Sequence, residues 1–223
     1  MGATGGFPID LILFGMIAAF LVLRLRSILG KRQGFERPPE AMPRPDLRVV
    51  DDPAGMAPPG AAMPPSSHTL PDAASPAGRA MVAMQSVDGA FSPDRFLQGA
   101  EAAFRMIVAA FAAGDRAALR PLLSDDTMAA FDGAITAREA AGETQRTEIR
   151  AINSTAIDSA ELRGGQASIT VAFVSDQVNI TLGRDGQPVA GTDAVTEIKD
   201  LWTFERDLGS PDPTWRLVAA RSA

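Results

Sequence analysis

Residues 92–115 read SPDRFLQGAEAAFRMIVAAFAAGD and predict a long amphipathic helix, on which the fold class depends. Ser92 is a preferred N-cap residue, Pro93 suits the first helical position, and Gly114 marks the end. The apolar residues recur three or four positions apart, which places them on one helix face: Phe96, Ala100, Ala103, Phe104, Ile107, Val108 and Phe111. A helix with such a face buries it against another part of a folded domain.

Two more helices and about four strands are predicted after this helix. Asp115 begins a short helix, and Ser124 caps a longer one over residues 124–143 with Met128, Phe131 and Ile135 on one face. From residue 147 the period changes to that of strands, which are predicted over residues 147–163, 166–182, 195–207 and 214–223, with a Gly-Gly turn between the first two. Helices grouped before strands predict an α+β domain, with about three helices packed on a four-stranded antiparallel sheet.

Both tryptophans flank the loop LGSPDP, residues 208–213, and they could be core filler, a pocket wall or a docking surface. With the loop midpoint near Ser210, antiparallel pairing sets Phe204 opposite Trp215 and Trp202 opposite Leu217, all on the inward face. Glu205 then points outward. This alternation favours core filler or pocket lining over a docking surface.

The segment before residue 91 divides into a leading helix and a tether. Residues 76–88 predict a short helix with Ser75 as N-cap and an apolar patch of Met81, Val82 and Met84 that packs or binds a partner. We assign residues 76–223 to the α+β domain. Residues 36–90 contain eleven of the seventeen prolines and no aromatic residue, so residues 31–75 are interpreted as a Pro-rich disordered tether. His68, the single histidine, is expected to be a solvated tether residue.

Residues 1–30 are predicted to be an N-terminal membrane anchor with a single transmembrane helix. Thirteen uncharged residues run from Leu11 to Leu23, no basic residue precedes them and no A-x-A site follows, which favours an uncleaved span over a removed leader. Four basic residues flank the span on its C-terminal side, Arg24, Arg26, Lys31 and Arg32. The positive-inside rule then predicts that the C-terminal domain faces the cytoplasm, with these cations near anionic lipid head groups.

Composition narrows the classes of function. Cysteine is absent and the domain contains no histidine, P-loop, GxGxxG or HExxH motif, so no catalytic residue, metal site or cofactor is predicted. Residues 91–223 contain 13 Lys and Arg against 19 Asp and Glu, which gives little reason to expect direct nucleic-acid binding.

Residues 92–126, SPDRFLQGAEAAFRMIVAAFAAGDRAALRPLLSDD, and residues 200–219, DLWTFERDLGSPDPTWRLVA, resemble the TimA proteins of bacteria. These share a domain family with the subunit that tethers the import motor to the mitochondrial inner-membrane translocase. The resemblance implies a cone-shaped, nuclear-transport-factor-two-like fold in which a curved antiparallel sheet and helices enclose a hydrophobic cavity. It also implies a role at the bacterial inner membrane, with lipids and with inner-membrane, translocase or ribosomal proteins as partners. The predicted cavity wall comprises Phe104, Phe111, Phe173, Trp202, Phe204 and Trp215.

Three hypotheses about function follow. A membrane-anchored protein-binding adaptor, not an enzyme, leads, in protein translocation or membrane-protein biogenesis. Lipid or small-molecule binding in the cavity is the alternative. Enzyme chemistry would require an inward carboxylate of raised pKa, for which the predicted strands offer Asp176, Glu197, Asp200 and Glu205.

Overall fold

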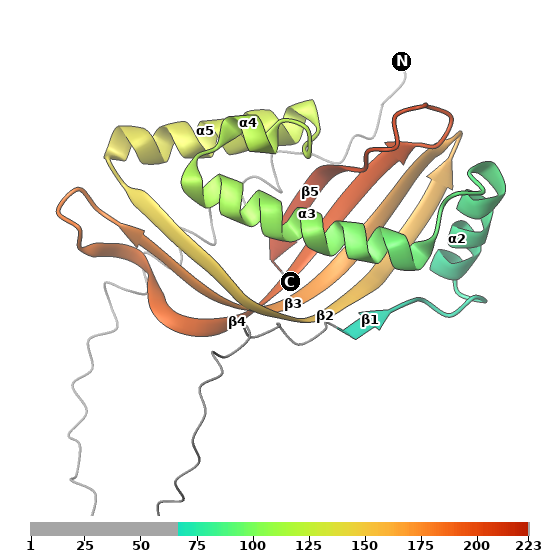
Figure 1. Cartoon of the computed structure of the whole chain (residues 1–223), viewed down its shortest axis with the longest axis horizontal. Coiled ribbons are helices and arrows are strands. Elements are labelled where there is room, and N and C mark those ends of the chain that lie inside the picture. The colour runs from blue at the N-terminus through green and yellow to red at the C-terminus, as the bar shows by residue number, and fades with distance from the viewer. Residues whose placement is uncertain (1–66, 223) are drawn as a thin grey trace, which may run out of the picture.

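The computed structural model describes residues 67–222, and Figure 1 shows their arrangement. The predicted transmembrane helix, its flanking cations Arg24, Arg26, Lys31 and Arg32, and residues 31–66 of the predicted tether lie outside the described residues. The described chain forms one short strand, four helices and four longer strands, in the order β1 (Ser67–Thr69), α2 (Pro76–Val87), α3 (Pro93–Ala113), α4 (Arg116–Leu119), α5 (Asp125–Ala141), β2 (Thr144–Arg163), β3 (Gln166–Leu182), β4 (Pro188–Asp207) and β5 (Arg216–Ser222). The α+β class is confirmed.

The helices begin where the sequence places their caps. The side chains of Ser75, Ser92 and Ser124 each accept a hydrogen bond from a backbone N–H three residues later, as Asp115 does for α4. Such bonds satisfy amide groups that have no partner within the helix itself. Gly114 ends α3 in the left-handed conformation, as the sequence indicates.

The sheet differs from the predicted four-stranded antiparallel one, because it has five strands and is mixed. Strands β2 to β5 pair in sequence order and antiparallel, while β1 pairs parallel to β2 with Ser67 opposite Ser154. Strand β1 has three exposed residues, Ser-His-Thr, which is too short for an alternating pattern to reveal. Its position beside β2 is a tertiary contact that covers one edge of the sheet.

His68 lies in a strand of the sheet, so its prediction as a tether residue is wrong, although the residue as a whole is exposed to solvent as expected. It lies in β1 opposite Thr155, and its Nε2 is 3.1 Å from Oε2 of Glu101 on α3. Only 25% of its side chain is exposed. Strand β1 therefore links the end of the predicted tether to both the sheet and the long helix.

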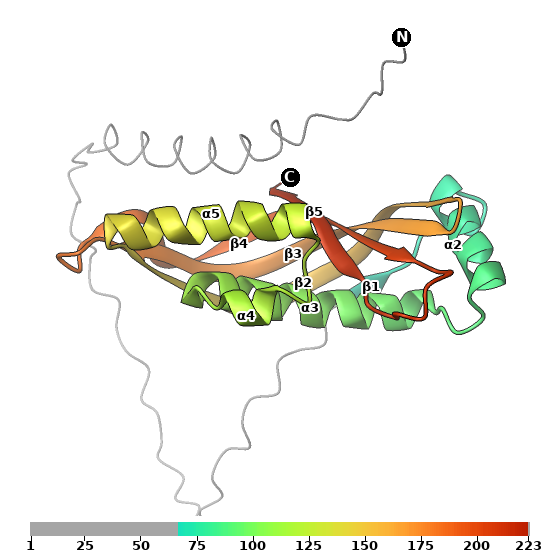
Figure 2. The same cartoon turned by 90° about the horizontal axis from the view of Figure 1, so that it is seen from above.

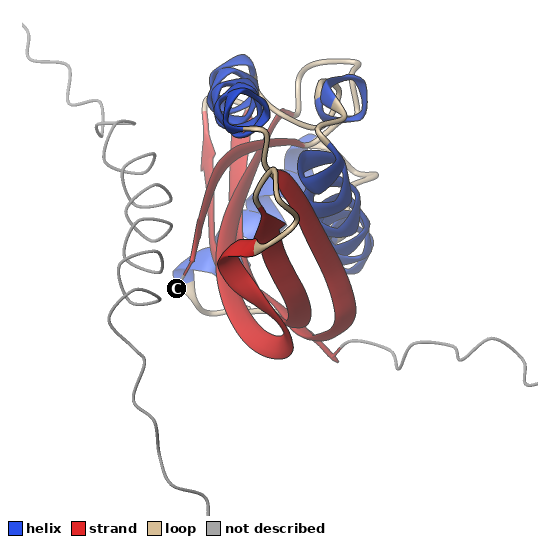
Figure 3. Cartoon of the chain, turned by 90° about the vertical axis from the view of Figure 1, so that its left-hand side faces the viewer, coloured by secondary structure: helices blue, strands red, loops and turns tan. Residues whose placement is uncertain are grey.

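The sheet is strongly curved, and the helices lie along one side of it (Figure 3). Extra residues interrupt the regular strand pairing in β2 between Ile149 and Ala151, in β4 between Thr192 and Thr196, and in β5 between Leu217 and Ala219. Bulges of this kind bend a strand and increase its twist. Seen from above, α3 and α5 both run along the length of the domain with strands visible between them (Figure 2).

The core is centred on α3, whose apolar face packs against β3 and β4. Phe104 is fully buried, stacks on Phe173 with ring centroids 4.5 Å apart, and meets Trp202 edge-on at 4.7 Å. Within residues 67–222, α3 is the one helix long and apolar enough to cross a membrane by length and composition. Because the face bearing Phe104 and Ile107 is buried against the sheet, α3 is the core helix of this domain.

The apolar patch predicted on the leading helix is divided between core and surface. Met81 and Met84 are 4% and 0% exposed and belong to the hydrophobic core, whereas Val82 is 56% exposed. The two methionines therefore pack α2 onto the domain rather than forming a free adhesive surface.

The predicted pairing of β4 with β5 is wrong in register but right about the inward face. Phe204 lies opposite Leu217 and Trp202 opposite Ala220, with a shift between Thr203 and Phe204. Trp202, Phe204 and Leu217 are buried, at 6%, 1% and 0% exposure. Trp215 precedes β5 and packs half-buried against Phe96, with ring centroids 4.8 Å apart.

We expect Phe104→Ala to lower the free energy of unfolding of the full chain by about 3–5 kcal/mol, because it opens a cavity where no side chain can replace the ring. Met106→Ala, on the same helix at 51% exposure, is the matched control and should change it by less than about 0.5 kcal/mol. Denaturant titration followed by tryptophan fluorescence measures both. Equal losses in the two variants would contradict the assignment of α3 as the core helix.

Candidate functional site

A partly open pocket of about 200 Å³ lies between the C-terminal half of α3, α5 and the sheet. Its apolar lining comes from both helices and from β4 and β5, and comprises Ile107, Val108, Phe111, Phe131, Ile198, Trp202 and Ala220. Its polar lining comes from the four long strands, and comprises Gln145, Thr147, Gln177, Asn179, Asp200, Arg221 and Ser222. The pocket is therefore amphipathic rather than a purely hydrophobic cavity.

The structure distributes the six predicted cavity-wall residues over three places. Phe111 and Trp202 line the pocket. Phe104, Phe173 and Phe204 lie behind it in the close-packed core. Trp215 packs with Phe91 and Phe96, which continue the same aromatic core through the contact of Phe96 with Phe204 at 6.1 Å.

Asp200 is the carboxylate that the fold brings into the pocket. It pairs with Phe173 across β3 and β4 and is half-buried, and Ser222 donates a 3.4 Å hydrogen bond to its Oδ1. Burial raises the pKa of this carboxyl group to about 6, and the Ser222 hydrogen bond acts in the opposite direction. Asp176, Glu197 and Glu205, the other carboxylates considered from sequence, do not line the pocket.

The position of Asp200 is readable from strand alternation. It precedes Trp202 by two residues, and residues two apart on a strand share a face of the sheet. The same alternation that places Trp202 and Phe204 inward therefore places Asp200 inward. What alternation leaves open is whether that position meets packed side chains or a pocket.

The polar wall is organised by a chain of hydrogen bonds. Gln145 Nε2 donates to Thr147 Oγ1 and to Asn179 Oδ1, at 3.1 and 3.3 Å, and Thr147 Oγ1 donates to the same Asn179 oxygen at 3.1 Å. Gln177 Nε2 donates to Ser175 Oγ at 2.8 Å. These bonds hold the side-chain amides on β2 and β3 in fixed orientations along one side of the pocket.

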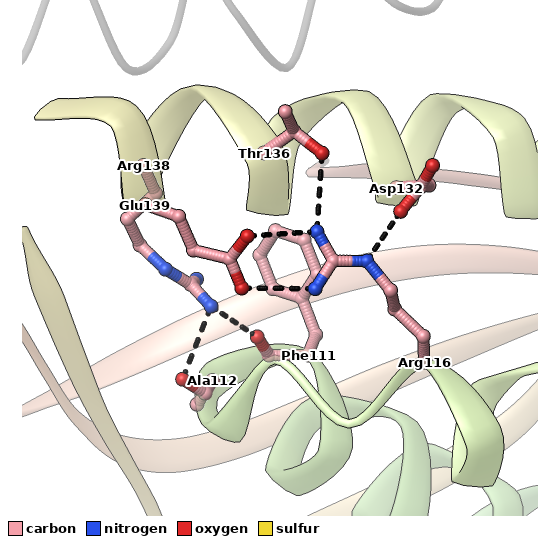
Figure 4. Close-up of polar contacts among 7 residues, drawn as sticks. All are labelled: Phe111, Ala112, Arg116, Asp132, Thr136, Arg138 and Glu139. Atoms are coloured by element: carbon pink, nitrogen blue, oxygen red, sulfur yellow. Dashed lines mark hydrogen bonds and ion pairs between the residues drawn. The ribbon is translucent and has the colours of Figure 1, made fainter.

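Arg138 on α5 connects this wall to the two helices. Its guanidinium donates to Gln145 Oε1. It also donates to the carbonyl oxygens of Phe111 and Ala112 at the C-terminal end of α3 (Figure 4), and it lies 5.2 Å from the Phe111 ring centroid. Burial lowers the pKa of Arg138. The guanidinium supplies a donor to the Ala112 carbonyl at the helix end and a second donor to the Phe111 carbonyl, which also accepts from the Gly114 N–H.

Arg116 at the start of α4 forms a second link to α5. Its guanidinium donates to both oxygens of Glu139, at 2.9 Å each, and also to Asp132 and Thr136 (Figure 4). The hydrogen bonds from Arg116 lower the pKa of Glu139. The hydrogen bonds to Glu139 and Asp132 raise the pKa of Arg116. Together the two arginines hold α3, α4 and α5 in the arrangement that covers the pocket.

These groups define what the site can do chemically. The Asp200 carboxylate, with a pKa of about 6, can bind a cation or accept and release a proton. The side-chain amides can donate and accept hydrogen bonds, and the aromatic rings can pack against an apolar group. No group of three or more His, Cys, Asp or Glu side chains suited to a metal ion occurs within residues 67–222.

Comparison with known proteins assigns the chain to a class and then to a family. The helices and the curved sheet define an α+β domain, and the sequence matches the Tim44-like domain over residues 77–222, more than half of the chain. The protein therefore belongs to the Tim44-like domain family. No curated protein matches it. The crystal structure of the intermembrane space region of the chloroplast protein ARC6 aligns at 9% identity and a TM-score of 0.42, covering 56% of this chain and 95% of that one.

We expect Asp200→Asn to raise the free energy of unfolding above about pH 6 by about 1–3 kcal/mol and to flatten its pH dependence. In the folded chain the Asp200 carboxyl group keeps its proton up to about pH 6, whereas the ordinary pKa of an aspartate carboxyl group is 3.8. The folded chain therefore binds more protons between these values, and stability falls as pH rises through that window. Denaturant titration at several pH values compares the variant with the parent chain.

Glu139 and Asp212 act with the opposite sign, because their pKa values are lowered and their contribution is lost as pH falls. The difference between parent and variant isolates Asp200 from these groups. Ser222→Ala should raise the pKa of Asp200 further, so the decrease in the free energy of unfolding with rising pH should extend to higher pH. A difference between parent and Asp200→Asn that does not vary with pH would contradict the assignment.

Proposed function

We propose that this protein is a membrane-anchored, protein-binding adaptor or scaffold that acts in protein translocation or membrane-protein biogenesis. The observation that carries this proposal is the match of residues 77–222 to the Tim44-like domain. The sequence before the domain supports it, because an apolar segment and a Pro-rich stretch precede the module. The role we propose is non-catalytic.

The surface of the domain offers places for protein contact near the end of the tether. Three of the exposed large apolar residues, Leu70, Val82 and Val87, occur between β1 and the end of α2, at 41%, 56% and 54% exposure. Val189 and Val195 on the outer half of β4 form a second exposed apolar pair. Apolar surface of this kind is used in contacts between proteins.

The location we propose is the bacterial inner membrane, with the C-terminal domain in the cytoplasm. It rests on the apolar segment Leu11–Leu23 and on the four cations that follow it, as set out from the sequence. Partners are then inner-membrane lipids together with inner-membrane, translocase or ribosomal proteins. Direct binding of nucleic acid forms no part of the proposed role.

A photo-crosslinking amino acid at Val82 should capture an inner-membrane, translocase or ribosomal protein in native membranes. Val195, a valine of similar exposure on β4, provides the matched position. Mass spectrometry of the adducts identifies the captured chains. Adducts at Val195 alone would keep the adaptor role and move the binding surface to β4, whereas the absence of such proteins at both positions would count against the role.

Protease added to intact spheroplasts should leave the domain uncut, because the proposed topology places it in the cytoplasm. Immunoblotting with an antibody against the domain follows the fragment. Permeabilised cells are the control, in which the same protease should digest exposed segments. Digestion in intact spheroplasts would put the domain outside and contradict the topology.

A second candidate function is small-molecule binding in the pocket, and Asp200 is the observation that favours it. A half-buried carboxylate beside Trp202 and Phe111 can hold a ligand. The same carboxylate also supports a catalytic role as the competing hypothesis, because acid–base catalysis uses an inward Asp of raised pKa.

A further inference from the structure

The pocket presents hydrogen-bond acceptors to a ligand on its sheet side. Asp200 contributes a carboxylate whose hydrogen-bond partner within residues 67–222 is Ser222, at 3.4 Å. Gln177 commits its Nε2 to Ser175, which leaves its Oε1 as an acceptor. A ligand that donates hydrogen bonds and carries positive charge therefore complements these groups.

Asp200 is the charged lining residue that faces the inner side of the sheet. Arg221 also lines the pocket, but it follows Ala220, which is buried opposite Trp202, and precedes Ser222, which bonds Asp200. Successive residues of a strand point to opposite faces, so the Arg221 side chain starts on the outer face. The residues contributed by α3, α5, β2 and β3 are uncharged: Ile107, Val108, Phe111, Phe131, Gln145, Thr147, Gln177 and Asn179.

The size and walls of the pocket limit the ligand further. A volume of about 200 Å³ is smaller than the roughly 300–1,000 Å³ of pockets that hold drug-sized molecules. The helix side of the pocket carries Phe111 and Phe131, in edge-on contact at 5.0 Å, and the sheet side adds the ring of Trp202. Such rings attract apolar groups, and Phe131 and Trp202 can also attract a cation, whereas the Phe111 ring already contacts the Arg138 guanidinium at 5.2 Å.

We propose that this pocket binds a small organic cation, namely an ammonium or guanidinium group carried on a compact alkyl or aryl body. Asp200 is the counter-ion, and Phe111, Phe131 and Trp202 enclose the apolar body, while Gln177 offers a further acceptor on the same wall of the pocket. An anionic ligand would meet the Asp200 carboxylate at short range, which is unfavourable in surroundings that are partly desolvated.

This inference is independent of the adaptor role, because it concerns the pocket and not the exposed surfaces on α2 and β4. Failure of crosslinking leaves it untouched, and failure of ligand binding leaves the adaptor role untouched. It deepens the second candidate function by naming a ligand class. A neutral or anionic ligand of the same size is the competing outcome.

The test uses three probes of similar shape with the full chain in lipid nanodiscs: 2-phenylethylamine, 2-phenylethanol and 3-phenylpropanoate. Isothermal titration calorimetry measures each, and empty nanodiscs correct for partition into lipid. We expect the ammonium to bind at least about tenfold more tightly than the alcohol or the carboxylate, since a charge-assisted hydrogen bond to a carboxylate is stronger than a neutral one. Equal affinities, or tightest binding of the carboxylate, would overturn the proposal.

Two aspartate variants test whether Asp200 is the residue that binds the ammonium group. Asp200→Asn should weaken binding of the ammonium about tenfold and leave that of the alcohol unchanged. Asp176→Asn is the matched control, because Asp176 pairs with Glu197 on the same two strands and does not line the pocket. An equal loss of affinity for the ammonium in the two variants would show a general effect of charge and would contradict the assignment of Asp200 as the counter-ion.

The parent chain provides a test that requires no substitution. Asp200 and Arg221 are the titratable groups of the lining, and arginine stays charged from pH 5 to pH 8. A primary alkylammonium also keeps its charge over this range. Because the pKa of Asp200 is about 6, binding of 2-phenylethylamine should weaken about tenfold between pH 8 and pH 5, while binding of the alcohol stays constant. A pH-independent affinity for the ammonium would contradict the role of Asp200.

Discussion

The structure depends on the burial of one face of α3 against the concave side of a curved sheet. Phe104 stacks on Phe173 and meets Trp202 edge-on, so one helical ring joins β3 and β4. Every other element is positioned by this contact: α2 adds Met81 and Met84 to the same core, and α5 closes the far end through Phe131. Burial of aromatic and aliphatic side chains on this scale supplies most of the stability of a domain of this size.

The pocket exists because the helix and sheet diverge beyond this contact. Extra residues in β2, β4 and β5 bend the strands, and toward the C-terminal end of α3 the floor of the sheet becomes polar. Buried side chains of α5 pack it into the core, and Arg138 and Arg116 fix it across the opening by bonds to carbonyl, amide and carboxylate oxygens. A space lined on one side by rings and on the other by amides and Asp200 is the result.

Much of this arrangement is present in the sequence as local pattern. The capping residues Ser75, Ser92, Asp115 and Ser124, and the helix end at Gly114, are short-range signals because a cap acts within one turn. The inward face of β4 follows from alternation. The register between β4 and β5 could not be predicted, because Phe204 pairs with Leu217, two residues beyond the expected partner Trp215, and an extra residue on β5 shifts the pairs beyond it by one more.

The sequence alone determined the class of the domain, the caps and faces of its helices, and membership of a family that two long motifs carry. Those properties follow from hydrophobic period and from residues close together in the chain. Only the tertiary structure decided that β1 joins the sheet through three residues, that His68 meets Glu101, and that Asp200 faces a pocket while Phe104 is packed. These outcomes depend on contacts between distant segments and on how far the helices and sheet separate, which no local pattern encodes.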